Sequence, residues 1–172
     1  MTDDPFSPPP ELRRPERRLR GRMVAPVTLW TAGQEEARTG LTVSSILVAE
    51  GDPSSVLGLV NDMSGLWDAV HATGAFVVHV LERRHRALAE RFAGARPSPG
   101  GLFHGLDVAA SRWGPCLADV GTRACCGLVG ATEVGYQQLV RGVIERVEIG
   151  AVEDPLGFFR GRYRALAPRG AP

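Results

Sequence analysis

The chain has 172 residues, of which 44% are hydrophobic, and its formal net charge is +1 at pH 7. This length suits a single domain with a full core, and the balanced charge gives no strong field toward nucleic acid or a membrane surface. All 20 basic residues are arginine, which excludes mechanisms that need a Schiff-base lysine or a P-loop lysine.

Residues 1–21 have the composition of a flexible, proline- and arginine-rich arm. Acidic and proline residues stand where a secretion signal would need a basic region and an apolar core. No apolar run approaches the roughly 20 residues that span a bilayer, so we expect a cytoplasmic protein that contacts neither membrane nor nucleic acid. The arginines between Arg13 and Arg22 are consistent with an anion-binding arm, but a short solvated helix or arm is the interpretation we prefer.

From residue 22 onward the chain is predicted to be mainly β. Apolar and β-branched runs, separated by turn residues, mark the strands. The predicted strands are 24–31, 39–49, 56–60, 75–81, 124–132, 139–149 and 158–166. The polar stretch 32–36 is predicted to join the first two strands as a hairpin.

Two short helices interrupt the strands. Residues 66–72 fit one of them, and Leu81, Leu88 and Phe92 recur at the spacing of an amphipathic helix that ends near Gly94. The composition of residues 95–101 predicts a loop. Residues 102–119 have only a weak hydrophobic pattern. Many strands without β-α-β alternation favour an antiparallel barrel or sandwich.

The stretch from Gly40 to Ser45 places three hydroxyl side chains, those of Thr42, Ser44 and Ser45, within four residues. Hydroxyl donors and nearby backbone N–H groups suit the acceptor oxygens of a phosphate. An ordinary explanation remains open, because threonine is a good strand residue and a serine can satisfy a neighbouring backbone group. Asn61 to Ser64 follow a strand exit, where turn residues and ligand contacts both occur.

The order of these motifs carries a resemblance to a known family. The motifs are Gly40-Leu41-Thr42-Val43-Ser44-Ser45, Asp52-Pro53, the apolar strand into Asn61, Phe76-Val77-Val78-His79-Val80-Leu81, Arg91-Phe92-Ala93-Gly94 and Gly161-Arg162-Tyr163. In this order they resemble the flavin reductase-like, FMN-binding split-barrel family. The resemblance covers residues 22–167 as one domain and leaves 168–172 as a C-terminal tail.

The resemblance implies a mainly β, antiparallel Greek-key split barrel with a few short helices. It also implies a homodimer with flavin near the subunit interface. Phe92 would lie near the flavin or nicotinamide, although its spacing from Leu88 equally explains a core residue. The cofactor-binding residues implied in this way are Thr42, Val43, Ser44, Ser45, Asn61, Ser64, Trp67 and Phe92.

The activity that the resemblance implies is hydride transfer from NADH or NADPH to flavin, with FMN as the expected flavin and FAD also open. A flavin-dependent monooxygenase would be the partner that uses the reduced flavin. Because the cofactors perform the redox step, no protein nucleophile or metal site is expected. The alternatives are a flavin- or deazaflavin-dependent oxidoreductase that acts directly on another substrate, and a flavin-binding protein without turnover.

Three departures from the family pattern bear on nicotinamide use. The family's Gly-Asp-His before the penultimate long strand is replaced by Gly135-Tyr136-Gln137, so Tyr136 and Gln137 are the candidates on the nicotinamide side. After the asparagine, the family pattern has a basic residue and then Ser-x-Thr-His. In this chain Asp62, Leu66 and Trp67 occupy those positions after Asn61. His79 stands in place of a strand asparagine.

The histidines and cysteines show no spacing typical of a metal site or a nucleophile. His79, in an apolar strand, is predicted to be a satisfied core or interface residue. Cys116, Cys125 and Cys126 are predicted to be small buried thiols.

Overall fold

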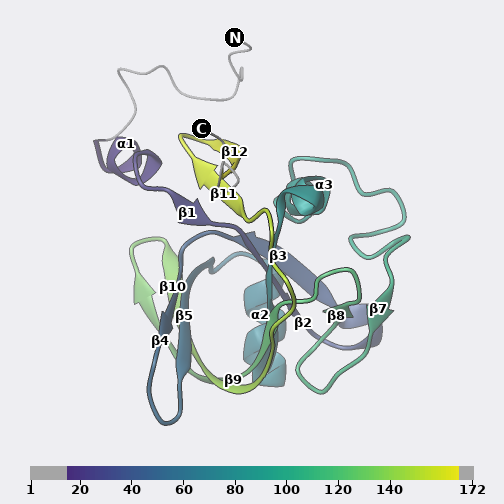
Figure 1. Ribbon diagram of the computed structural model, residues 1–172. Coiled ribbons are helices and arrows are strands. Elements are labelled where there is room, and N and C mark those ends of the chain that lie inside the picture. The colour runs from purple at the N-terminus through teal and green to yellow at the C-terminus, as the bar shows by residue number, and fades with distance from the viewer. Residues whose placement is uncertain (1–14, 167–172) are drawn as a thin grey trace.

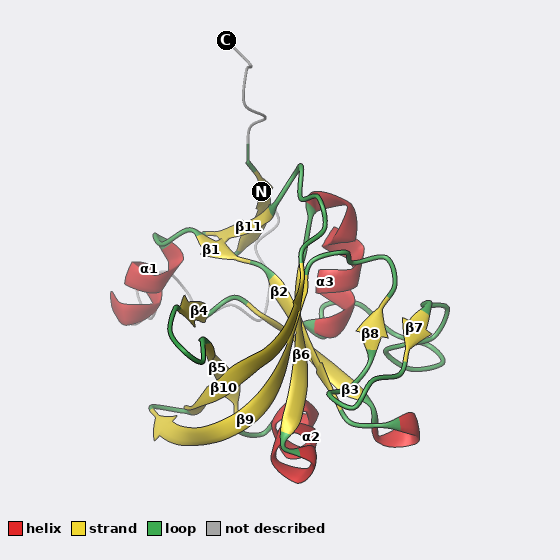
Figure 2. Ribbon diagram, turned by 60° about the horizontal axis from the view of Figure 1, so that its bottom comes forward, coloured by secondary structure: helices red, strands yellow, loops and turns green. Residues whose placement is uncertain are grey.

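The computed structural model describes residues 15–166, so the predictions for residues 1–14 and for the tail 168–172 lie outside it. The fold is mainly antiparallel β with a few short helices, as the sequence predicts (Figure 2). The helices are α1 (Pro15–Gly21), α2 (Gly65–Thr73) and α3 (Arg86–Phe92), with single 3-10 turns η2 (Glu35–Ala37) and η3 (Arg83–His85). The strands are β1 (Ala25–Pro26), β2 (Thr28–Ala32), β3 (Thr39–Val43), β4 (Ile46–Ala49), β5 (Ser55–Asn61), β6 (Ala75–Val80), β7 (Val108–Ala109), β8 (Cys116–Leu117), β9 (Arg123–Val134), β10 (Gln137–Glu148), β11 (Leu156–Phe159) and β12 (Arg162–Ala165).

Seven strands form the barrel in the order β3-β2-β6-β9-β10-β5-β4 (Figure 1). The two edge strands, β3 and β4, are successive stretches of the chain, so the sheet rolls up until its edges meet. At the junction the backbone N–H of Leu59 in β5 donates to the carbonyl of Ser45 at 3.0 Å. The expected strand 39–49 is therefore broken at Ser44 and Ser45, where it changes its partner from β2 to β5.

The barrel interior is filled around two stacked aromatic rings. Trp30 and Phe76 lie with ring centroids 4.7 Å apart and nearly parallel. Two glycines make room for them, because a Cβ on Gly58 would lie 2.6 Å from the Trp30 indole and one on Gly142 would lie 2.5 Å from the Phe76 ring. The apolar face of α2 joins this core, which explains why a short helix folds there.

A smaller sheet, β1-β11-β12, is attached to the barrel through Val27. The Val27 N–H donates to Leu156 at 3.1 Å, and its carbonyl accepts from Leu81 at 3.1 Å. The predicted strand 24–31 is thus divided at Val27, because its two halves belong to different sheets. Leu29, Leu81 and Phe92 share a second apolar cluster between this junction and α3.

Two predicted elements differ from the structure. The single strand 158–166 is wrong, because Arg160 (φ 50°) and Gly161 (φ 74°) both adopt left-handed backbone and turn the chain into the hairpin β11-β12. The helix expected from Leu81 begins at Arg86, after the turn η3, and Leu81 reaches the same apolar cluster from the end of β6.

The arginine-rich segment from residue 15 forms the exposed helix α1, which agrees with the solvated helix considered for it. Within residues 15–166, no helix has the length and apolar character needed to cross a membrane.

Candidate functional site

The junction between β3 and β4 presents two hydroxyl groups. Ser44 and Ser45 are both half-buried, and neither side chain forms a hydrogen bond within the described part of the chain. A hydroxyl that is partly shielded from water and has no protein partner is well suited to donate to a ligand. These two serines are therefore the strongest phosphate-binding candidates of the stretch from Gly40 to Ser45.

Thr42 and Val43 have structural tasks. The Thr42 hydroxyl donates to the carbonyl of Ala89 at 2.7 Å and so ties β3 to α3. Its proton is already used, and only its oxygen lone pairs are left for a ligand. The Val43 side chain is buried in the barrel, and its carbonyl accepts from the Thr28 hydroxyl at 2.6 Å.

The turn from Asn61 to Ser64 starts helix α2. The Ser64 hydroxyl donates to the Asn61 carbonyl at 2.6 Å and accepts from the Trp67 N–H at 3.2 Å, which makes Ser64 the N-cap of α2. The Asn61 side-chain oxygen accepts from the Met63 N–H at 2.9 Å. The Asn61 amide NH₂ has no partner among residues 15–166, so it is the donor that this turn can offer.

The two aromatic candidates lie in apolar surroundings. Trp67 is half-buried against the barrel core, with its ring 5.4 Å from that of His71. Phe92 is 2% exposed and meets Phe103 edge-on at 5.2 Å. This position matches the core role that the spacing of Phe92 from Leu88 allowed.

The hairpin between β9 and β10 places one nicotinamide-side candidate, Gln137, next to the flavin-side candidate Asn61. Gly135 and Tyr136 form its two-residue turn, and Tyr136 is 81% exposed. Gln137 is paired directly with Asn61 across β10 and β5. Ser45 lies beside Leu59 on the other side of β5, so Ser45 and Gln137 flank the last three residues of that strand, which ends at Asn61.

His79 lies inside the fold, as predicted. It has 0% exposure, its Nδ1 lies 3.1 Å from the Leu29 carbonyl, and its Nε2 accepts from the Leu117 N–H at 3.1 Å. Burial lowers the pKa of His79 to about 4, against the opposing effect of the hydrogen bond to Leu29. His79 is therefore neutral near pH 7 and has a structural role.

The cysteines are buried thiols, also as predicted. Burial raises the pKa of Cys125 to about 11 and that of Cys126 to about 12, so neither is a thiolate nucleophile at neutral pH. Among residues 15–166, no group of three histidine, cysteine or acidic side chains could hold a metal ion.

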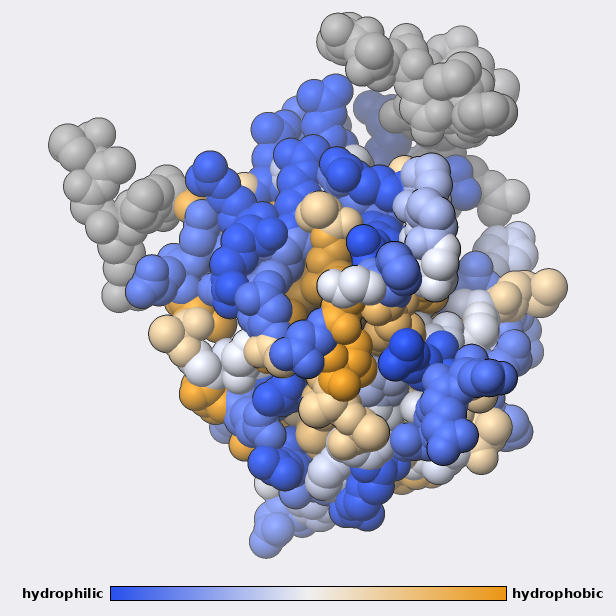
Figure 3. Space-filling view, turned by 90° about the vertical axis from the view of Figure 1, so that its right-hand side faces the viewer, coloured by the Kyte–Doolittle hydropathy of each residue, from blue (hydrophilic) through white to orange (hydrophobic). Residues whose placement is uncertain are grey.

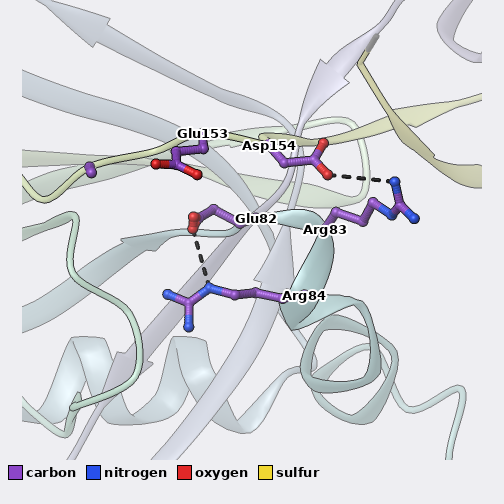
Figure 4. A pocket seen from close by; sticks show the side chains of 6 residues that line it. Glu82, Arg83, Arg84, Glu153 and Asp154 are labelled. Carbon is purple, nitrogen blue, oxygen red and sulfur yellow. Dashed lines mark hydrogen bonds and ion pairs between the residues drawn. The ribbon is translucent and has the colours of Figure 1, made fainter. Parts of the chain in front are cut away.

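A charged hollow of about 580 Å³, which the sequence does not reveal, lies where the barrel meets the small sheet (Figure 4). Its side chains pair with one another, Arg83 with Asp154 at 3.6 Å and Arg84 with Glu82 at 3.3 Å. The backbone N–H of Arg83 also donates to the Asp154 carbonyl at 2.8 Å. These contacts join two parts of the fold, and we assign the hollow no ligand.

Comparisons with known proteins agree with this fold. The "FMN reductase (NADH) RutF" of Ancylobacter novellus is 28% identical over 155 residues, which cover 90% of this chain and 86% of that protein. The "Flavin-dependent monooxygenase, reductase subunit HsaB" of Mycobacterium tuberculosis is 27% identical over 155 residues, covering 88% of this chain and 81% of that protein. The solved structure of the Streptomyces globisporus "NADH:FAD oxidoreductase SgcE6" superimposes with a TM-score of 0.81 at 26% identity, and the match covers 94% of this chain and all (100%) of that one. The model of the flavin reductase like domain matches residues 20–167, and the chain therefore belongs to the flavin reductase like family.

Proposed function

We propose that this protein is a flavin reductase that transfers a hydride from NADH to FMN or FAD. The observation that carries this proposal is the family match over residues 20–167, together with the hydroxyl and amide side chains at the end of β5 inside the matched region. Relatives named as an FMN reductase that uses NADH and as an NADH:FAD oxidoreductase support NADH as the reductant and leave both flavins open.

The residues at the β3-β4 junction fit the polar part of a flavin. The hydroxyls of Ser44 and Ser45 and the amide of Asn61 would hold the phosphate and ribityl oxygens, because each has a donor without a partner among the described residues. Thr42 would act indirectly, by holding α3 against β3. Trp67, half-buried beyond Asn61, would form a wall of the flavin pocket.

Bound flavin supplies the redox chemistry, accepting a hydride from the reduced nicotinamide. The chain would hold the nicotinamide and flavin rings in the orientation that hydride transfer needs and would exclude water from between them. Gln137 stands at the histidine position of the Gly-Asp-His pattern that the resemblance implies. Its neutral amide would orient a nicotinamide carboxamide by hydrogen bonds but cannot deliver a proton near pH 7. The exposed ring of Tyr136 would cover the nicotinamide from the hairpin tip.

A homodimer is part of the proposal. In the β4-β5-β10 part of the barrel, Leu47 is paired with Leu57, and Leu59 with Leu139, so apolar side chains form rows across neighbouring strands. Leu47 is 72% exposed, and its neighbours in these rows are half-buried. A second copy of the chain would bury this surface, because contiguous exposed apolar patches mark interaction sites.

A separate monooxygenase is the proposed user of the reduced flavin. Support comes from relatives named as reductase components, including HsaB and the reductase component of a Thermus thermophilus 4-hydroxyphenylacetate 3-monooxygenase. Such a reductase would release its reduced flavin, so its turnover would rise with the concentration of free flavin.

The test is steady-state oxidation of NADH and NADPH by the purified protein, with FMN, FAD or no flavin added. NADH oxidation that rises with added flavin would support the proposal and identify the preferred pair. If flavin binds but neither nicotinamide is oxidised, the replacement of the family histidine by Gln137 would favour a flavin-binding oxidoreductase with another reductant.

A further inference from the structure

A second hollow, of about 390 Å³, lies between α3 and the segment that follows it, and none of the candidate flavin or nicotinamide residues lines it. Its volume is within the range of about 300–1,000 Å³ that is usual for small-ligand pockets. The wall on one side comes from η3 and α3, and on the other side from residues 96–120. The hollow is therefore built by two parts of the chain that are held together by packing.

The floor of this hollow is apolar. Leu117 and Val120 are almost fully buried, and Leu88 and Leu106 pack against the same apolar cluster. Figure 3 shows the side of the molecule that carries α3, β7 and β8, where hydrophobic atoms gather between hydrophilic ones. An apolar floor of this kind favours the ring or alkyl part of a ligand.

Three arginines line the rim, and they differ in what they bind. Arg84 pairs with Asp119 at 2.8 Å and with Glu82 at 3.3 Å, and Arg96 pairs with Glu90. Arg91 has no carboxylate partner among residues 15–166.

Arg91 contacts two backbone carbonyls instead. Its Nη1 donates to Leu102 at 3.4 Å and to His104 at 3.1 Å. This leaves the Nε and Nη2 groups of Arg91 without partners in the described part of the chain. A half-buried arginine with two uncommitted donor groups beside an apolar floor is a ready site for a planar anion.

The carboxylates of the wall are fewer than its arginines. Asp119 is engaged by Arg84 and lies 3.2 Å from the His85 ring. Asp107 is the other acidic residue of the wall. Glu82 and Glu90, outside this wall, pair with Arg84 and Arg96. Arg91 is therefore the one arginine of the wall that no carboxylate among residues 15–166 pairs with, and its charge favours an anionic ligand.

We propose that this hollow binds a small organic carboxylate with an apolar body, separately from flavin and nicotinamide. The carboxylate would accept two hydrogen bonds from Arg91, and the apolar body would lie on Leu88, Leu106 and Leu117. Since Arg91 also holds the carbonyls of residues 102 and 104, an occupant would stabilise the wall formed by that segment. Carboxylate binding depends only on the geometry of this hollow and does not require the protein to be a reductase.

The test is isothermal titration of the full-length protein with benzoate and with cyclohexanecarboxylate. Benzamide, which has the same body without the charge, and acetate, which has the charge without the body, are the matched probes. We expect both apolar carboxylates to bind roughly tenfold or more tightly than benzamide, the factor expected for a hydrogen bond to a charged group. They should also bind more tightly than acetate, which has no apolar body to bury on the floor. No heat with either carboxylate, or equal affinity for benzamide, would overturn the proposal.

Variants locate the site. Arg91→Gln should weaken benzoate binding roughly tenfold or more, and Leu106→Glu should abolish it by placing a carboxylate in the floor. The control is Arg86→Gln, because Arg86 lies on α3, pairs with Glu90 at 2.9 Å and does not line the hollow. Near-UV circular dichroism checks that each variant is folded. Leu106→Glu keeps the test decisive if the loss of Arg91 loosens the 102–104 segment.

Competition separates this proposal from the proposed function. Saturating FMN or NAD⁺ should leave the affinity for benzoate unchanged, since no candidate residue for either cofactor lines the hollow. Competitive displacement by either one would make the hollow part of the reductase site and would refute a separate carboxylate site. Binding that persists in a protein without NADH oxidation would support the carboxylate site while the reductase proposal failed.

Discussion

The Nε2 atom of His79 accepts a hydrogen bond from the backbone N–H of Leu117 at 3.1 Å, and this bond fixes the end of the 95–117 segment to the barrel wall. Because Nε2 is the acceptor, the proton of the neutral ring lies on Nδ1 and is donated to the Leu29 carbonyl. One buried imidazole thus bridges β2, β6 and β8. Protonation would turn Nε2 into a donor facing another donor.

Folding stability should therefore fall in weak acid. The pKa of His79 is lowered to about 4 in the folded protein, while the unfolded chain has the ordinary value of about 6.5. The unfolded state then binds more protons between these values, so stability is complete above about pH 6.5 and decreases as the pH falls toward 4. We expect the His79 contribution to fall by about 2 kcal/mol by pH 5.

Urea unfolding at pH 7.5 and pH 5 measures this effect. His79→Asn, which removes the titrating ring, should show a smaller loss between the two pH values than the parent protein. Equal losses in both proteins would mean that His79 does not carry the pH dependence.

Ser44→Ala and Ser45→Ala should each weaken FMN binding while they spare riboflavin. A hydrogen bond from a hydroxyl to a charged phosphate contributes about 1.5–3 kcal/mol, and riboflavin has no phosphate. Fluorescence titration with both flavins measures the difference. Matched losses for FMN and riboflavin would indicate that the two serines shape the junction and do not contact the phosphate.

Thr42→Val should behave differently, because the Thr42 hydroxyl already donates to Ala89. Removing this bond leaves a carbonyl of α3 without its partner, so we expect the protein to lose about 1–3 kcal/mol of stability. FMN and riboflavin should be affected to a similar degree, through the position of α3. A loss confined to FMN would show that Thr42 contacts the phosphate directly.

The nicotinamide-side residues can be tested without disturbing the flavin contacts. Gln137→Ala should raise the KM for NADH and leave the Kd for FMN within about twofold, since its amide is a neutral hydrogen-bonding group. Tyr136→Phe, which keeps the ring, should have a smaller effect than Tyr136→Ala. NADH kinetics that are unchanged in all three variants would rule out a role for the hairpin tip in nicotinamide binding.

The proposed dimer surface predicts a change of mass in solution. Leu47→Arg places a charge on the apolar β4-β5-β10 surface and should shift the protein toward monomer, because burying an unpaired charge in an interface is costly. Leu19→Arg is the matched control, since Leu19 is 66% exposed and lies on α1. Light scattering coupled to size-exclusion chromatography gives the masses, and a parent protein that is monomeric at all concentrations would contradict the dimer.

The sequence by itself determined the class of the fold and most strand positions. Alternating and β-branched runs recovered β5, β6, β9 and β10 to within a few residues, because a strand that is buried on one face must repeat every second residue. Only the tertiary structure decided where strands break, because Val27 and Ser44 each stand where one strand leaves its partner for another. The same holds for the hairpin turn Arg160-Gly161, where a non-glycine residue adopts left-handed backbone because β11 and β12 pair on either side of it.

The candidate site, too, depends partly on sequence and partly on tertiary structure. The clustering of hydroxyls, and their order relative to Asn61, singled out the β3-β4 junction. The sequence could not tell which donors are free, since that depends on partners far along the chain: Ala89 uses the Thr42 proton, whereas the described residues leave those of Ser44 and Ser45 without a partner. Periodicity and motifs record local preference, whereas hydrogen-bond satisfaction is settled only when distant segments pack together.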